Sequence, residues 1–321
     1  MTGPFRAVLA LAAALSWAAP LPAADLFVIG GKPDDPFWTI VRRGAEDAAA
    51  MVEAQAGSVT WLGLDSYDNL GADAAALIRE AVARGADGLV APDWQPEVMD
   101  PAFREAAAAG IPFVIYNAGG REAADRLGAL AYIGSDNAGN GEAAGRYFAD
   151  HGFTRAVCIN TLPGLANIRE MCDGMAAGLA AHGGQGEMLV LEEGSFGDRS
   201  LVSDAVKAHL LANPQVTGVF AIGNFDAGAV DEAIIRAGKA GRVKFGGTNL
   251  DGPALAGIRA GSQLFAVDQQ GYLQGVLGVT LLNAHVNFGL TLPEGQILTG
   301  PGLVDLSNID LVERGISRGA R

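Results

Sequence analysis

Short apolar runs alternate with longer, alanine-rich stretches along the chain after residue 24. The first apolar run covers residues 26–29, and after a double glycine and a polar turn residues 37–55 have the composition of a helix. Within the turn, Asp35 is a candidate helix cap and Pro36 suits the first helical turn. Such alternation is typical of parallel sheets whose strands are joined by helices, so the pattern predicts an α/β fold.

The strand and helix signals fall into two similar series of βα units. Two such series imply two lobes, each a doubly wound parallel sheet, and 321 residues exceed what one hydrophobic core usually holds. Residues 118–128 are predicted to be irregular, and residues 298–304 to form one further extended run. The predicted strands are 26–29, 59–64, 88–91, 113–116, 131–134, 156–160, 188–191, 216–222, 243–246 and 264–267. The predicted helices are 37–55, 72–84, 96–109, one that follows a cap at 135–137 and ends at 150, 167–181, 200–212, 227–237, 253–260 and 271–286.

The amino-terminal 24 residues differ from the rest of the chain. Arg6 precedes an apolar stretch at 7–19, and the small residues Ala23 and Ala24 close the segment, which is the pattern of a secretory signal peptide. The apolar stretch is short for a membrane span, which needs roughly 20 residues. A buried first helix is the alternative, but the stretch has no polar face. We therefore predict a cleaved signal peptide at 1–24 and a periplasmic mature protein.

The formal net charge of −14 at pH 7 argues against nucleic acid as a partner, since an acidic surface mainly serves solubility. The cysteines Cys158 and Cys172 are close enough in sequence to close a modest loop. In an exported protein such a pair can form a disulfide. Two buried free thiols are the alternative, and we favour the disulfide.

Polar side chains collect where the predicted strands end, and in open α/β sheets the carboxyl ends of the strands border the ligand crevice. Helix caps and tight turns favour the same residue types and explain part of the set. Phe37 and Trp38 either stack on a ligand, or Phe37 packs inward while Trp38 shields a loop. Amides, carboxylates and aromatic faces together suit sugars and polyols. The candidates are Asp35, Asp93, Asn117, Ser135, Asp136, Asn160, Asn167, Arg169, Asn224, Asp226, Asn249, Asp251, Asp268 and Gln269, with Phe37, Trp38, Phe196 and Phe225.

Catalytic chemistry has little support in the sequence. The four histidines fall on or just after predicted helices, where a solvated helix face explains them. Motifs of serine hydrolases, zinc proteases, P-loops and dinucleotide-binding folds are absent from the sequence. A hydrolase on this fold would need a pair of carboxylates in the crevice, as in glycosidases, and nothing in the sequence pairs them. We therefore predict no catalytic residue, no metal and no cofactor.

Six segments carry a resemblance to a known family. They are DPFW after the first strand, IPFVIYN at 111–117, IGSDN at 133–137, the helix start Arg169-Glu170, NPQVTGVFAIGN at 213–224 and VDQQGYLQG at 267–275. In this order and spacing they resemble the ribose-binding-protein-like periplasmic receptors of bacterial ABC transporters. The resemblance covers nearly the whole mature chain.

The resemblance implies the type I periplasmic binding protein fold, in which a three-segment hinge joins two lobes. The crossings would lie near Gly134, Asp268 and Leu298. The amino-terminal lobe would then comprise residues 25–134 and 269–297, and the carboxy-terminal lobe residues 135–268 and 298–321. Hinge closure around a ligand would present a joined surface to the membrane permease, and the protein is expected to be a monomer.

The resemblance also implies roles for individual residues. Asp35, Phe37 and Trp38 match the first ligand loop, Arg169 a binding arginine, Phe196 a stacking aromatic, and Asn224 and Gln269 amide ligands. Asn117 and Asn249 stand where the ribose receptor has binding aspartates, and Ala118 stands where it has a second arginine. These replacements would remove charged hydrogen bonds worth about 1.5 to 3 kcal/mol each, which argues against ribose itself.

Together these observations predict a receptor that binds a small neutral sugar or polyol and delivers it to an ABC permease. A receptor for chemotaxis or sensor-kinase signalling is the alternative, and an exported hydrolase is the weaker third hypothesis. The predicted ligand-binding residues are Asp35, Phe37, Trp38, Asp93, Asn117, Ser135, Asn167, Arg169, Phe196, Asn224, Asn249 and Gln269.

Overall fold

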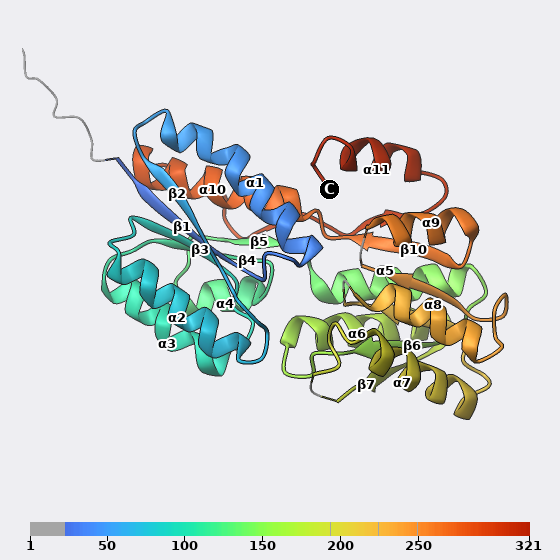
Figure 1. Ribbon diagram of the computed structural model, residues 1–321. Coiled ribbons are helices and arrows are strands. Elements are labelled where there is room, and N and C mark those ends of the chain that lie inside the picture. Colours follow the sequence, from blue (N-terminus) through green and yellow to red (C-terminus); the bar gives the residue numbers. More distant parts are fainter. Residues whose placement is uncertain (1–22, 193, 224, 249) are drawn as a thin grey trace, which may run out of the picture.

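The computed structural model describes residues 23–321 apart from 193, 224 and 249, and in these residues two six-stranded sheets form the centres of two lobes (Figure 1). The strand orders are β11-β5-β4-β3-β1-β2 and β12-β10-β9-β8-β6-β7. Neighbouring strands pair in parallel except β10 and β12, which are antiparallel. The prediction of an α/β fold with two doubly wound sheets is confirmed.

The amino-terminal lobe is the first sheet with the helices that cover it. Helices α1 and α10 lie together on one face of this sheet, and α2, α3 and α4 lie on the other (Figure 1). The central strands β1, β3 and β4 are buried almost throughout, which explains their continuous apolar sequences. Its strands are β1 (Asp25–Gly30), β2 (Ser58–Gly63), β3 (Gly88–Ala91), β4 (Phe113–Tyr116), β5 (Tyr132–Gly134) and β11 (Gln296–Leu298), and its helices are α1 (Pro36–Glu53), α2 (Leu70–Ala83), α3 (Pro96–Ala108), α4 (Gly120–Leu127) and α10 (Gly271–Phe288).

The carboxy-terminal lobe is the second sheet with its helices, among which α5 packs against α6 and α7 against α8. Cys158 on β6 and Cys172 on α6 form a disulfide, the pairing favoured from the sequence, and it ties α6 to the sheet. The strands are β6 (Arg155–Asn160), β7 (Gln185–Val190), β8 (Gly218–Ala221), β9 (Lys244–Gly247), β10 (Gln263–Asp268) and β12 (Gly302–Val304). The helices are α5 (Asn137–Asp150), α6 (Ala166–Ala180), α7 (Arg199–Ala212), α8 (Asp226–Arg236), α9 (Gly252–Ala260) and α11 (Ile309–Ile316).

Two glycines let α5 and α6 pack with their backbones in contact. A Cβ added at Gly141 would lie 2.0 Å from the carbonyl oxygen of Met171, and one added at Gly174 would lie 2.2 Å from that of Ala138. No side chain fits at such distances. The start of α6 is therefore held rigidly relative to α5, and this start faces the other lobe.

Two segments differ from their predictions. Residues 118–128, predicted to be irregular, contain α4, which begins after Gly119 and ends before Gly128, both with positive φ angles. Residues 298–304, predicted as one extended run, belong to two strands: β11 pairs with β5 in the first sheet and β12 with β10 in the second. Helix α11 follows and was not predicted; its buried Ile309 and Val312 pack against the second sheet.

The chain passes between the lobes three times. The connections run from β5 to α5, from β10 to α10 and from β11 to β12 (Figure 1). The lobe boundaries drawn from the sequence stay predictions. Most of the predicted signal peptide, residues 1–22, lies outside the described residues. Within the described residues, no helix combines the length and the apolar character needed to cross a bilayer.

Candidate functional site

Side chains from both lobes line one cavity at the carboxyl ends of the central strands. The cavity offers ≈ 80 Å³ to the centres of water molecules. A cavity of this size has room for several waters or one small ligand. The amino-terminal lobe contributes Asp35, Phe37, Trp38, Tyr67, Leu70, Trp94 and Asn117; the carboxy-terminal lobe contributes Leu162, Leu165, Asn167, Ile168, Met171, Phe196, Ile222 and Gly223; and Gln269 comes from the second connection.

Asp35 lies on the loop between β1 and α1 and caps that helix, as its sequence context predicts. Its Oδ1 accepts a hydrogen bond from the backbone N–H of Phe37 at 3.0 Å, and Pro36 occupies the first helical position. Its Oδ2 accepts a hydrogen bond from the hydroxyl of Tyr67 at 2.8 Å. The cap therefore also fixes a buried carboxylate in the cavity wall.

Tyr67 is a cavity residue that the sequence did not reveal. It lies on the loop after β2, and its hydroxyl accepts a hydrogen bond from the backbone N–H of Lys32 at 3.2 Å while it donates to Asp35. Burial and the neighbouring Asp35 carboxylate raise the pKa of Tyr67 above its usual range, so the hydroxyl keeps its proton. The available signal was its position: an aromatic residue just beyond the end of a strand that neighbours β1.

Trp38 is part of an aromatic cluster as well as part of the cavity wall. Its side chain is 6% exposed, and its ring lies 5.2 Å from Phe37, 5.4 Å from Trp94 and 5.9 Å from Tyr116, measured between ring centres. Phe37 is half-buried, and Trp94 was not predicted as a site residue. The ring of Trp38 thus belongs to the core of its lobe, and a ligand-stacking role for Trp38 stays a prediction.

The two lobes contact each other through residues that line the cavity. The ring centres of Tyr67 and Phe196 lie 5.4 Å apart in an edge-to-face arrangement. Leu165, next to the start of α6, is buried in the core of the amino-terminal lobe, and Ile168 packs against the same core. The structure therefore has its two lobes closed around the cavity.

Asn117, Asn167 and Gln269 are the predicted amides that line the cavity. Asn117 follows β4 with a φ of 63°, in the left-handed region where asparagine is one of the better-tolerated residues. Its backbone carbonyl accepts a hydrogen bond from the hydroxyl of Tyr132 at 3.0 Å, and its side-chain N–H donates to Gln274 at 3.2 Å. The Oδ1 of Asn167 is buried and has no hydrogen-bond partner among the described residues.

Three predicted residues lie outside the cavity wall. Asp93 is buried against Arg126, with 2.7 Å between its Oδ2 and a guanidinium nitrogen. Burial and the nearby Asp100 raise the pKa of Asp93 to about 6, although Arg126 works in the opposite direction. Ser135 is buried in the first connection, and Arg169 is exposed on α6. Their roles in binding stay predictions, and the predicted Asn224 and Asn249 lie outside the described residues.

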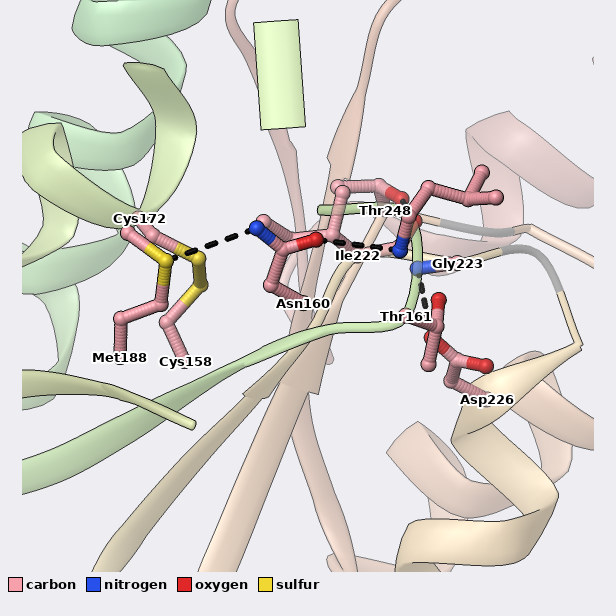
Figure 2. Close-up of a disulfide and its surroundings, with 10 residues drawn as sticks. Cys158, Asn160, Thr161, Cys172, Met188, Ile222, Gly223, Asp226 and Thr248 are labelled. Atoms are coloured by element: carbon pink, nitrogen blue, oxygen red, sulfur yellow. Dashed lines mark hydrogen bonds between the residues drawn. A yellow bond between two sulfur atoms is a disulfide. The ribbon is translucent and has the colours of Figure 1, made fainter. Parts of the chain in front are cut away.

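Asp226 lies directly behind the cavity wall. Its Oδ2 accepts hydrogen bonds from the backbone N–H of Gly223 at 3.0 Å and from the hydroxyl of Thr161 at 3.2 Å (Figure 2). Burial raises the pKa of Asp226 to about 6, although both hydrogen bonds lower it. The carboxyl group thereby holds the loop after β8, whose Gly223 lines the cavity.

The electrostatic character of the wall follows from these placements. Among the described residues that line the cavity, Asp35 is the one charged side chain, and no lysine or arginine lines it. The other groups are amides, rings and aliphatic side chains. Within the described part of the chain, no group of three or more His, Cys, Asp or Glu side chains is placed to hold a metal ion.

Comparisons with known proteins agree with this architecture. A family model described as the periplasmic binding protein domain matches residues 26–290. The xylose/arabinose-binding protein XylF of Sulfolobus acidocaldarius is 26% identical, and the match covers 90% of this chain and 76% of that protein.

Solved structures extend the comparison. A carbohydrate transporter from Acidothermus cellulolyticus 11B, in complex with myo-inositol, is 30% identical with a TM-score of 0.83, covering 94% of this chain and 100% of that one. An ABC transporter solute binding protein from Burkholderia graminis C4D1M, in complex with D-arabinose, is 21% identical with a TM-score of 0.76, covering 89% and 96%, and shows the likeness of fold. Because the family model matches most of the chain and the inositol complex is 30% identical over nearly all of it, the chain belongs to the periplasmic binding protein family.

Proposed function

We propose that the chain is a periplasmic receptor that captures one small neutral sugar or polyol between its lobes and delivers it to the membrane subunits of an ABC transporter. It acts as a monomer and needs no cofactor. The named ligands of similar proteins, xylose, arabinose and myo-inositol, support this class of ligand.

The observation that carries the proposal is the composition of the cavity wall. Three amides and one carboxylate alternate with five aromatic side chains, and both lobes contribute to each kind: the polar groups are Asp35, Asn117, Asn167 and Gln269, and the rings are Phe37, Trp38, Tyr67, Trp94 and Phe196. Hydroxyl groups donate to and accept from such polar groups, while the C–H faces of a sugar ring pack on aromatic rings. Because no described lining residue is cationic, sugar phosphates and sugar acids fit this wall poorly.

Closure of the lobes provides the link to transport. A ligand that contacts both walls stabilises the closed form over the open one by its difference in affinity for the two forms. In the closed form Tyr67 of one lobe meets Phe196 of the other, so the outer surfaces of both lobes are presented together. A permease that recognises this joined surface distinguishes loaded from empty receptor.

The test is a thermal-shift and calorimetric screen of residues 25–321. The panel contains myo-inositol, D-xylose, L-arabinose, D-arabinose and glucose, with inositol phosphate and glucuronate as anionic counterparts. We expect at least one neutral compound to raise the melting temperature, because a ligand at 100 times its Kd adds roughly 2.7 kcal/mol to the stability of the folded state. Uptake of the same compound should fall in cells that lack the gene.

Matched variants locate the binding event. Asn117→Ala and Gln269→Ala each remove an amide from the wall and should weaken binding. Asn283→Ala removes an amide from α10 that is about as buried as Asn117 but lies outside the cavity wall, and it should leave the affinity unchanged. Binding of anionic but not neutral compounds, or silence from the whole panel, would contradict the proposal.

A further inference from the structure

Gln274, on the first turn of α10, lies behind the cavity wall and touches two of its residues. It is completely buried, and Thr299 of the third connection beside it is 3% exposed. Its Oε1 accepts a hydrogen bond from Nδ2 of Asn117 at 3.2 Å. Its Nε2 donates to the backbone carbonyl of Gln269 at 3.0 Å and to Oγ1 of Thr299 at 3.3 Å. This network joins the end of β4 in the amino-terminal lobe to the second and third connections.

Hydrogen-bond chemistry allows one orientation of these amides. The backbone carbonyl of Gln269 can only accept hydrogen bonds. The hydroxyl of Thr299 donates its one proton to that same carbonyl at 2.8 Å, so toward Gln274 it can only accept. Both partners on this side of Gln274 are therefore acceptors, so the side chain of Gln274 must direct its NH₂ group toward them. The Oε1 of Gln274 then faces Asn117, whose side-chain N–H must donate to it.

The orientation of Asn117 follows from that of Gln274. Rotating the Asn117 amide by half a turn would bring its Oδ1 against Oε1 of Gln274, and two acceptors in contact leave both unsatisfied at a buried position. In the observed orientation, Oδ1 of Asn117 accepts no hydrogen bond from the residues that the structure describes. Because Asn117 lines the cavity, its Oδ1 stays available to accept a hydrogen bond from the ligand.

We infer that Gln274 is a positioning residue that makes Asn117 an obligate acceptor toward the ligand. The inference rests on the proposed function and sharpens it. The ligand must place a hydrogen-bond donor, a hydroxyl or an amine, opposite Asn117. A compound with an acceptor-only substituent at that point is rejected, even when it has the same size and shape. Since Asn117 and Gln274 belong to the same lobe, this preference exists before the lobes close.

The first test measures ligand discrimination position by position. Wild-type protein and Gln274→Leu are titrated calorimetrically with myo-inositol and D-arabinose and with the monodeoxyfluoro derivatives of each, in which one hydroxyl becomes an acceptor-only fluorine of similar size. In the wild type we expect one position at which the replacement weakens binding at least about 10-fold more than in Gln274→Leu. In the variant Asn117 can turn and offer its N–H, so the penalty at that one position should shrink while the penalties elsewhere persist.

Controls separate positioning from general damage. Thr299→Val keeps the shape of the side chain but removes one hydrogen-bond partner of Gln274. It should therefore reduce the affinity penalty of the fluorine replacement at the same ligand position, but less than Gln274→Leu does. Asn283→Leu replaces another buried amide of α10 and should leave the whole pattern unchanged. Equal penalties at every position in wild type and Gln274→Leu would overturn the inference, and so would a uniform loss of affinity in Gln274→Leu.

The second test needs no ligand. Nuclear magnetic resonance of the ligand-free protein follows the side-chain NH₂ of Asn117, which is assigned by its disappearance in Asn117→Asp. We expect slow exchange of this group with water in the wild type and in Asn283→Leu, and fast exchange in Gln274→Leu. Fast exchange in the wild type would refute the positioning role. If no neutral compound of the panel bound the wild type, the proposed function would fail, whereas slow exchange of the Asn117 NH₂ in the wild type and fast exchange in Gln274→Leu would still support the positioning role of Gln274.

Discussion

Replacing Asp226 by asparagine should make the protein more stable at neutral pH and leave it unchanged near pH 4. Asp226 is 1% exposed, and burial raises its pKa to about 6 against an ordinary value of 3.8. Asparagine has the same shape, and its carbonyl can accept the bonds from Thr161 and the N–H of Gly223 that the carboxylate accepts now. Its NH₂ group then occupies the place of Oδ1, which has no partner among the described residues.

The magnitude follows from proton linkage. Between about pH 4 and pH 6 the folded state keeps a proton on Asp226 that the unfolded state has lost, so stability falls as the pH rises through this window. The contribution of the proton is complete below the unfolded pKa of 3.8 and is lost above the folded pKa of about 6. Since one pKa unit corresponds to about 1.4 kcal/mol, the wild type should lose about 3 kcal/mol through this group, and the asparagine variant should not.

Urea unfolding of wild type and Asp226→Asn at pH 4.0, 5.0, 6.0 and 7.5 measures the effect. The difference between the two curves isolates Asp226 from Asp93, whose pKa is also raised to about 6 and which is present in both proteins. Asp65→Asn removes an exposed carboxylate and serves as the matched control. A pH-independent difference between wild type and Asp226→Asn, or a variant that is less stable at pH 7.5, would refute the reasoning.

Three further changes have defined outcomes. Trp38→Ala should lower the free energy of unfolding by about 3–5 kcal/mol as well as weaken ligand binding, because the ring is buried among other aromatic rings; unchanged urea unfolding would show that the ring contributes nothing to the core. Tyr67→Phe removes a hydrogen bond to the buried Asp35 carboxylate, so urea unfolding should show a loss of about 1.5–3 kcal/mol, and unchanged unfolding would show that this bond adds nothing to stability. Replacing both Cys158 and Cys172 by alanine should cost roughly 2–4 kcal/mol in urea unfolding, and wild-type stability would mean that the bond adds nothing.

Much of the fold could be predicted because the central strands are buried on both faces and read as uninterrupted apolar runs. Helix α4 was missed for a local reason: it begins at two glycines, has only eight residues and buries small side chains such as Ala123 and Ala124. The tail was misread for a non-local reason. Its apolar run is divided between two sheets: β11 forms an edge strand of the first sheet and β12 an edge strand of the second. The local sequence does not indicate where this division falls.

The site was predictable only as far as chain position determines it. Asn117 directly follows β4, and Asp35 and Phe37 lie where the loop after β1 enters α1; the rule that ligands bind at strand ends was enough to single them out. Tyr67 and Trp94 also follow strands, but they looked like ordinary loop residues without the sheet order that places β2 and β3 on either side of β1. The aliphatic wall from the start of α6 could not be inferred, because it becomes part of the site only when the lobes meet.

The threefold passage of the chain between the lobes means that neither lobe can be completed before residue 298 is synthesised. Domains generally fold amino-terminal first as the chain emerges from the ribosome. Strands β6 to β10 of the second sheet lie within one uninterrupted stretch, but that sheet gains its edge strand β12 only at residues 302–304, and the first lobe lacks α10 and β11 until residue 298 is made. Val279 and Leu282 of α10 belong to the buried core of that first lobe, so until then this core stays open on one face. Each lobe therefore waits for late elements, and the lobe that is translated first cannot close its core before most of the second lobe has been made.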